Sequence, residues 1–250
     1  MSYNPFSLEG KKVLITGASS GIGRAAAIEC SKVGAQVFLT GRSVSRLEET
    51  LNHMDGKEEH QLIPCDLSDS KEMDRLIDTL PEIQGVVNNA GYTIPAPIPF
   101  IDKDTYTAML SVNTVAPIYI LRTLLKKKKI KRGASIVFTS SLAALGKTYV
   151  GNTMYASCKG AISAFVQGAA LELSAKGIRV NAVCPGMVET NILSSGAISE
   201  EQIEIDKKNY PLHRYGRPEE IAWAMIYLLS DASAWTTGIN LVLDGGYSIK

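Results

Sequence analysis

The chain has 250 residues, of which 45% are apolar and 20% are charged, and this composition is typical of a folded globular protein. It excludes disordered, collagen-like and fibrous proteins. Lysine and arginine total 26 against 25 aspartates and glutamates, so the net charge of +1 creates no general attraction to nucleic acid or to anionic lipid. We expect no nucleic-acid partner and no membrane partner.

Cysteines and histidines show no spacing typical of a metal site or a disulfide framework. The three histidines have neither helical i, i+4 spacing nor a nearby cysteine. The four cysteines are widely spaced and form no C-x-x-C pair, so we expect reduced thiols in a cytoplasmic protein. The first ten residues lack the apolar core of a signal peptide, and no run of 18 apolar residues predicts a membrane span.

Short apolar runs rich in β-branched residues alternate with longer segments whose apolar residues recur every three or four positions, which predicts alternating strands and helices. In chain order we expect strands at 12–16, 36–40, 61–64, 85–88, 135–139, 178–183 and 240–243, and helices at 23–33, 44–54, 70–80, 108–126, 154–175 and 218–229. Strands that are apolar throughout are typical of parallel sheets covered on both faces. The prediction is one α/β domain over residues 1–250, a doubly wound Rossmann-type fold with a seven-stranded parallel sheet.

A glycine-rich turn joins the first predicted strand to the first predicted helix. Residues 16–24 read TGASSGIGR, a G-x-x-x-G-x-G spacing. Glycine lets the backbone turn sharply and approach a ligand, while free N–H groups at the helix start face an anion. A tight turn with no ligand is the alternative. The position predicts a cradle for the pyrophosphate of a dinucleotide, formed by Gly17, Ser19, Ser20, Gly21, Ile22 and Gly23.

The end of the second predicted strand indicates which dinucleotide binds. An NAD-binding protein would carry an acidic residue there for the ribose 2′-hydroxyl, but this chain has Gly41 and Arg42. The planar guanidinium of Arg42 suits a 2′-phosphate, so we expect NADP(H) as the cofactor, with a solvated arginine as the alternative. Asp66, after the third strand, could accept from the adenine amino group or cap a nearby helix.

Tyr155 and Lys159 lie four residues apart near the start of the predicted helix 154–175, so their side chains share one face. A free phenol has a pKa of about 10 and is a poor acid at neutral pH. An ammonium roughly 4 Å away, at an effective dielectric constant of about 20, would lower that pKa by about 3. We therefore expect Lys159 to bring Tyr155 toward the range of a general acid.

Two further polar groups accompany this pair. Ser140 and Ser141 follow the predicted strand 135–139, where a hydroxyl at the sheet edge can hold a carbonyl oxygen. Asn113 is a polar amide among apolar neighbours in the predicted helix 108–126, where a helix-bending or water-binding role is the common one.

Together these motifs resemble those of the short-chain dehydrogenase/reductase family, over residues 16–246. Residues 16–23 are similar to the family's cofactor loop, and 88–91 (NNAG) match the motif that braces the sheet against the cofactor. Pro185 and Gly186, with Thr190, match the motif on the nicotinamide side. The resemblance adds to the cofactor-binding set Asp66, Leu67, Asn89, Ala90, Gly91, Pro185, Gly186, Val188 and Thr190, together with Tyr155 and Lys159.

The same resemblance implies four catalytic roles. Tyr155 would donate the proton and Ser141 would orient the carbonyl. Lys159 would lower the tyrosine pKa and hold the nicotinamide ribose, and Asn113 would position a water in a proton relay. The interval from Ser141 to Tyr155 is one residue longer than is usual in the family, so Ser140 remains an alternative for the carbonyl-binding hydroxyl.

The expected activity is NADPH-dependent reduction of a 3-oxoacyl group or another small ketone to a secondary alcohol. The short segment before Gly85 and the TTG at 236–238 also resemble the xylulose and carbonyl reductase branch, so a sugar or polyol oxidoreductase is an alternative. A catalytically silent NADP(H)-binding regulatory protein is a further one.

Three surface features concern substrate and partners. Residues 187–213 have weak periodicity beyond a strand end, and we expect them to form a substrate lid. The basic run from Lys126 to Arg132 could dock an acidic acyl carrier protein, although a solvated helix end is the favoured interpretation. Small residues along 154–175 would let a helix of a neighbouring subunit approach closely. The family resemblance implies a homotetramer, and a dimer is the alternative. The apolar candidates for the lid are Met187, Ile192, Leu193, Ile198, Ile203, Tyr210 and Leu212.

Overall fold

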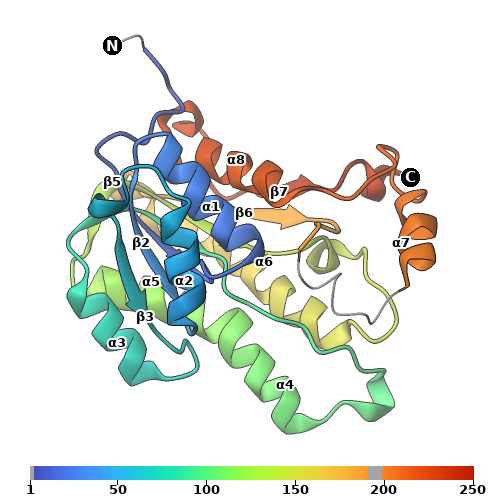
Figure 1. The fold of residues 1–250 in the computed structure, drawn as a ribbon. Coiled ribbons are helices and arrows are strands. Elements are labelled where there is room, and N and C mark those ends of the chain that lie inside the picture. Colours follow the sequence, from blue (N-terminus) through green and yellow to red (C-terminus); the bar gives the residue numbers. More distant parts are fainter. Residues whose placement is uncertain (1–2, 191–198) are drawn as a thin grey trace.

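The computed structural model describes residues 3–190 and 199–250 (Figure 1). Within these residues, seven parallel strands form one sheet in the order β3-β2-β1-β4-β5-β6-β7, which confirms the predicted doubly wound fold. The strands are β1 (Lys12–Thr16), β2 (Gln36–Gly41), β3 (Gln61–Pro64), β4 (Ile83–Asn88), β5 (Ile130–Thr139), β6 (Arg179–Pro185) and β7 (Asn240–Leu243). The helices are α1 (Gly21–Lys32), α2 (Val44–Asn52), α3 (Ser70–Thr79), α4 (Lys103–Leu110), α5 (Ala116–Lys126), α6 (Thr153–Leu173), α7 (Glu200–Lys207) and α8 (Pro218–Leu229).

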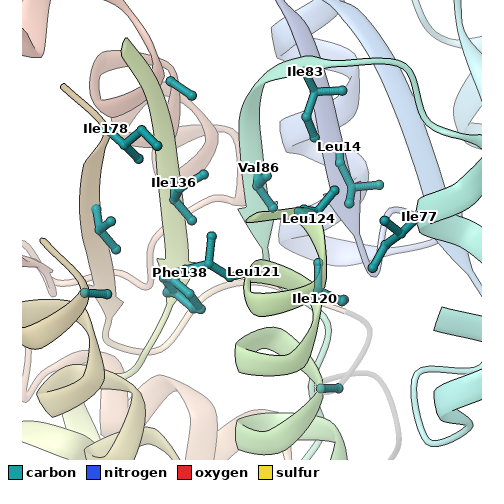
Figure 2. Packing of buried hydrophobic residues seen from close by; sticks show 14 of the residues in the cluster. Leu14, Ile77, Ile83, Val86, Ile120, Leu121, Leu124, Ile136, Phe138 and Ile178 are labelled. Carbon is teal, nitrogen blue, oxygen red and sulfur yellow. The ribbon is translucent and has the colours of Figure 1, made fainter. Parts of the chain in front are cut away.

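The sheet has a buried apolar cluster on each face. Successive residues of a strand point to opposite faces, so Leu14 belongs to one cluster while its neighbours Val13 and Ile15 belong to the other. Figure 2 shows the first cluster, in which Phe138 of β5 and Leu121 of α5 lie among the labelled side chains. Burial on both faces explains why the strands are apolar throughout.

The predicted helix 108–126 is longer and less regular than expected. Asp102 accepts the N–H of Thr105 at 2.7 Å, and this cap starts α4 at Lys103. Between α4 and α5 the chain forms a π-helical turn, Ser111–Val115, with Asn113 at its centre. Such wide turns are rare and are frequent at functional sites. The periodicity of apolar residues does not reveal a π-helical turn, because the turn shifts the helical phase of only a few residues.

In the described part of the chain, one continuous helical segment, Lys103–Lys126, is long and apolar enough to cross a membrane by length and composition alone. Of its apolar window, 50% is buried inside the domain, and Ile120 and Leu124 of this segment lie in the core cluster of Figure 2. The core helix of a folded domain meets the same criteria, so this finding is weak evidence for a membrane span.

Helix α7 was not predicted, because weak periodicity in this region gave no helical pattern. A local signal was present in the form of a capping box. Ser199 Oγ accepts the N–H of Gln202 at 3.2 Å, and Gln202 Oε1 accepts the N–H of Ser199 at 3.0 Å.

Parallel strands end at one edge of the sheet, which brings the ends of β1, β4, β5 and β6 together. The strand order reverses between β1 and β4. In open α/β sheets, ligands bind beyond the carboxyl ends of the strands at such a reversal. The candidate site is built there.

Candidate active site

The loop between β1 and α1 packs against the end of β4 with no room for side chains. Gly17 has a φ of +68°, and a Cβ on it would lie 2.9 Å from the Cα of Ala90. A Cβ on Gly23 would collide with the Gly17 carbonyl oxygen. Only glycine allows this close approach, which leaves the outer side of the loop for a ligand.

The first turn of α1 has unused donors. Ser20 is the N-cap residue, and its side chain makes no capping hydrogen bond. The loop itself is held from behind: Arg24 donates to the Ser19 carbonyl at 2.8 Å and to Glu49 at 2.9 Å, and the Thr50 hydroxyl donates to the Ala18 carbonyl at 2.9 Å. A rigid loop with free helical N–H groups is suited to an anion such as pyrophosphate.

Thr16 is a bracing residue that the sequence analysis did not single out. Its hydroxyl accepts the N–H groups of Asn89 and Ala90 at 2.9 and 3.0 Å. The Asn89 side chain in turn accepts from the Thr139 hydroxyl at 3.2 Å, which joins the ends of β1, β4 and β5. In the sequence, Thr16 is the first residue of the 16–23 motif, and that motif does not assign it a role of its own.

Arg42 and Asp66 lie on the same side of the sheet edge. Asp66 accepts from the N–H and hydroxyl of Ser68, and these bonds, with a smaller effect of the Arg42 charge, lower the pKa of its carboxyl group. The cap of α3 is Asp69, which accepts the N–H of Lys71, so the capping alternative for Asp66 is wrong. Arg42 is exposed and lines a cavity of about 490 Å³ together with Asp66.

Leu67 and Val188 have buried side chains, 6% and 8% exposed, in the two core clusters. Their side chains therefore pack in the core. Pro185 ends β6, and the next N–H, of Gly186, donates to the Leu243 carbonyl at 3.0 Å. Thr190 lies beside the glycine loop, since a Cβ on Gly21 would be 3.2 Å from Thr190 Cγ2.

Tyr155 and Lys159 share one face of α6 as predicted, with Lys159 Nζ 5.6 Å from the centre of the Tyr155 ring. Lys159 is 3% exposed and donates to the Thr139 carbonyl at 2.7 Å. Burial raises the pKa of Tyr155 to about 12, although the Ser141 hydroxyl lowers it, and burial lowers the pKa of Lys159 to about 8. The expected lowering of the tyrosine pKa by Lys159 is wrong for this geometry, because burial removes the phenolate from water and Lys159 is not among the groups that shift this pKa.

The two serines after β5 face different surroundings. Ser140 is 1% exposed, shares a hydrogen bond with Ser163 at 2.7 Å and donates to the Lys159 carbonyl at 3.0 Å. Ser141 is only half-buried; its hydroxyl accepts the Ala143 N–H at 3.2 Å and lies close enough to the Tyr155 phenol to lower its pKa. Of the two, Ser141 is therefore the hydroxyl beside Tyr155.

Asn113 lies 1% exposed in the π-helical turn. Its amide donates to the carbonyls of Tyr92 and Met109, both at 2.9 Å, and its Oδ1 accepts the Tyr92 N–H at 3.2 Å. A Cβ on Gly91 would lie 2.5 Å from Asn113 Oδ1 and 3.3 Å from Lys159 Nζ. Asn113, Lys159 and the NNAG motif thus meet at one point.

The predicted lid is only partly described. Ile192, Leu193 and Ile198 lie outside the described residues. Leu212 is 62% exposed, whereas Tyr210 is 4% exposed and packs below the segment that follows β6.

The basic run Lys126–Arg132 lies at the opposite edge of the sheet from Ser141. At 3.3 Å per residue, the length of β5 separates the two by about 30 Å. Lys127 pairs with Asp78 at 2.7 Å, Lys129 bonds the Leu80 carbonyl, and Arg132 bonds the Ala175 carbonyl. Half of the run therefore takes part in local contacts.

Comparison with known proteins agrees with this geometry. A family model described as enoyl-(acyl carrier protein) reductase matches residues 17–248. The chain belongs to the short-chain dehydrogenase/reductase family. Among members of this family, glucose 1-dehydrogenase of Gluconobacter oxydans is 36% identical over 96% of this chain and 92% of its own.

Two further short-chain dehydrogenases/reductases show the range of similar proteins. The 3-oxoacyl-[acyl-carrier-protein] reductase of Thermotoga maritima is 32% identical over 97% of this chain and 99% of its own. The solved structure of a putative 2-deoxy-D-gluconate 3-dehydrogenase from Agrobacterium tumefaciens, with bound NADP, has a TM-score of 0.89 and 28% identity. That match covers 99% of this chain and 100% of the other.

Proposed function

We propose that the protein reduces a small ketone to a secondary alcohol with NADPH. The observation that carries the proposal is the meeting of Ser141, Tyr155, Lys159 and Asn113 beside Gly91, at the sheet edge next to the glycine loop. A hydroxyl that can bind a carbonyl, a phenol that can release a proton and an ammonium that stabilises developing negative charge suit carbonyl reduction.

The residues present fit a dinucleotide. Gly17 and Gly23 let the loop pack directly on Ala90 and on itself, which leaves its outer side for a ligand, and the start of α1 has free N–H groups for the pyrophosphate. We assign the 2′-phosphate to Arg42, the adenine to Asp66 and the nicotinamide side to Gly186 and Thr190. The NADP bound to the similar Agrobacterium protein supports this choice. When bound, the dinucleotide would supply the hydride for the carbonyl carbon.

The chain's own residues handle the proton. With a pKa near 12, Tyr155 keeps its proton at neutral pH, the state that a donor to the carbonyl oxygen requires. Ser141 holds that oxygen, and Lys159 stabilises the phenolate that forms. Asn113 fixes the Gly91–Tyr92 backbone, and its Oδ1 has a second lone pair that can bind a water.

Exposed apolar side chains near Ser141 and Tyr155 favour an apolar ketone over a polyol. Tyr149 and Val150 are 57% and 89% exposed, and Ile94 is 45% exposed on the facing loop. The two loops are joined by the Ala96 N–H, which donates to the Gly151 carbonyl at 2.8 Å. Polyols need several closely spaced hydrogen-bonding groups, and among these three side chains only the Tyr149 hydroxyl is one.

A sugar or polyol oxidoreductase is the second candidate, because two of the similar proteins are named for glucose and 2-deoxy-D-gluconate. Turnover rates on a panel of alkyl ketones, acetoacetyl thioesters and ketoses, each with NADPH and NADH, separate the candidates. Faster turnover of ketoses would overturn the ketone proposal.

We propose a free substrate rather than one carried on an acidic protein, because the basic run lies about 30 Å from Ser141 along β5. We also propose a cytoplasmic homotetramer. All four cysteines are free and buried, and α6 exposes Ala161, Ala164, Gly168 and Leu171. Light scattering at micromolar concentration tests the assembly, and a monomer mass would contradict it.

The decisive experiment is Tyr155→Phe. Turnover should fall by about 10²–10⁴-fold, while the dissociation constant for NADPH stays close to that of the native protein. If the native protein binds NADPH and reduces no carbonyl on the panel, a regulatory binding protein replaces the enzyme proposal.

A further inference from the structure

In the segment after β6, both the backbone N–H and the backbone carbonyl of Met187 are hydrogen-bonded. Its N–H donates to the Tyr210 phenol oxygen at 3.2 Å, and its carbonyl accepts the Gly216 N–H at 3.0 Å. Two residues on, the Glu189 N–H donates to the Gly216 carbonyl at 2.8 Å. The backbone after Pro185 is therefore fixed by residues 210–216, a segment that follows α7 in the sequence.

The Tyr210 ring is itself held on several sides. It occupies space beside two glycines, since a Cβ on Gly186 would lie 3.4 Å from its Cε1 and a Cβ on Gly245 would lie 3.6 Å from its Cδ1. Tyr247 stacks on it with centroids 4.8 Å apart, and Tyr215 meets it edge-on at 5.5 Å. This packing fixes the direction of the phenol oxygen.

The Tyr210 phenol oxygen accepts a hydrogen bond and stays protonated. Burial raises the pKa of Tyr210 to about 12, so it stays neutral across the working range. The neighbouring Tyr215 phenol has another task, because it donates to the Asp206 carboxylate at 2.7 Å. Among these two phenols, Tyr210 is the one that reaches the strand end.

Met187 lies where a bound ligand would contact the backbone. Gly186 and Met187 follow β6 at the carboxyl edge of the sheet, where the ligand of an open α/β fold binds. The same segment continues to Thr190, beside Gly21 of the glycine loop. A shift of the Met187 backbone would therefore move the wall of the site opposite the pyrophosphate cradle.

The geometry points to Tyr210 as a positioning residue that presets the Gly186–Met187 backbone for the nicotinamide half of the dinucleotide, an inference that rests on the proposed cofactor. Tyr210 acts through Met187 and does not contact the reacting atoms. Removing its hydroxyl should weaken binding of the nicotinamide half and leave the adenosine half unaffected.

The test compares Tyr210→Phe with a control, Tyr227→Phe. Tyr227 lies on α8, and the control removes its hydroxyl, which is bonded to Thr236. Dissociation constants are measured by calorimetry for NADPH and for 2′-phospho-ADP-ribose, which lacks the nicotinamide. Tyr210→Phe should weaken NADPH binding about fivefold, the effect of one neutral hydrogen bond, and change binding of the fragment less than twofold. Tyr227→Phe should change neither.

Equal weakening of both ligands by Tyr210→Phe, or weakening of neither, would overturn the role of Tyr210 while leaving the proposed function intact. Failure of the native protein to bind NADPH would overturn both.

Hydrogen exchange of the native protein gives a second test that needs no variant. The Met187 amide should already be protected without any dinucleotide, because Tyr210 accepts from it. Exchange as fast as in exposed loops would overturn the inference. In Tyr210→Phe, this amide should exchange about five times faster.

Discussion

The Lys159 ammonium lies 5.6 Å from the Tyr155 ring centre and donates to the Thr139 carbonyl at 2.7 Å, so the backbone of β5 holds this cation in place. This bond orients Nζ but leaves its charge partly desolvated. Tyr155 remains a protonated phenol, and Lys159 becomes the group of the pair that titrates nearer to neutral pH.

The pH dependence of reduction should follow Lys159. Its pKa is lowered to about 8, so the ammonium is present below pH 8 and lost above it, while Tyr155, with a pKa of about 12, stays protonated. We expect kcat/KM for ketone reduction to be flat below about pH 7 and to fall up to tenfold per pH unit above about 8. Initial rates of NADPH consumption from pH 6 to 10 measure this, and a flat profile to pH 10 would contradict it.

The two adjacent serines should separate activity from stability. Ser141→Ala should lower kcat by about 10²–10³-fold, because it removes the donor to the carbonyl oxygen. It should lower the free energy of unfolding by no more than about 1 kcal/mol, through loss of the acceptor for the Ala143 N–H. Ser140→Ala should lower the free energy of unfolding by about 1–3 kcal/mol, because it removes the buried contacts with Ser163 and the Lys159 carbonyl. Steady-state kinetics and urea unfolding of both variants test the pair, and the reverse pattern would assign the catalytic role to Ser140.

Cofactor choice should depend on Arg42. Arg42→Ala removes a charged contact to the 2′-phosphate, so the dissociation constant for NADPH should rise about 10–100-fold while that for NADH stays constant. Fluorescence titration with both nucleotides measures the ratio. Arg46→Ala, in the first turn of α2, is the matched control and should leave the ratio unchanged. Equal weakening of both nucleotides by Arg42→Ala would rule out the assignment.

The glycine loop should tolerate no methyl group at position 23. Gly23→Ala would drive a Cβ into the Gly17 carbonyl oxygen and should lower the free energy of unfolding by about 1–3 kcal/mol and weaken NADPH binding. Gly160→Ala on α6, outside the exposed residues assigned to the subunit interface, has nothing within 4 Å of the new Cβ and should stabilise the fold by about 0.5–1 kcal/mol. Thermal unfolding compares the two variants, and equal effects would contradict the steric argument.

The basic run offers a test of carrier docking. Lys128→Glu with Lys131→Glu should leave KM unchanged for a small ketone and for a carrier-linked oxoacyl substrate, because the run lies at the edge of the sheet remote from Ser141. A rise in KM confined to the carrier-linked substrate would instead support docking of an acidic carrier.

Local patterns in the sequence predicted most of the architecture. Apolar runs and helical periodicity are properties of neighbouring residues, so all seven strands were found, and the i, i+4 spacing put Tyr155 and Lys159 on one face. The glycine spacing likewise predicted the loop that packs on Ala90. The start of α4 and the capping box of α7 were local signals that periodicity alone overlooked.

Long-range packing decided the rest of the site. Ser140 and Ser141 are equivalent in sequence, and only the position of Ser163 on α6 buries one and leaves the other beside Tyr155. The sign of the tyrosine pKa shift depends on how much water the folded chain excludes, which no spacing records. Tyr210 reaches Met187 across 23 positions because β6 and the segment after α7 meet at one sheet edge. Contacts of this kind exist only once the strands are assembled.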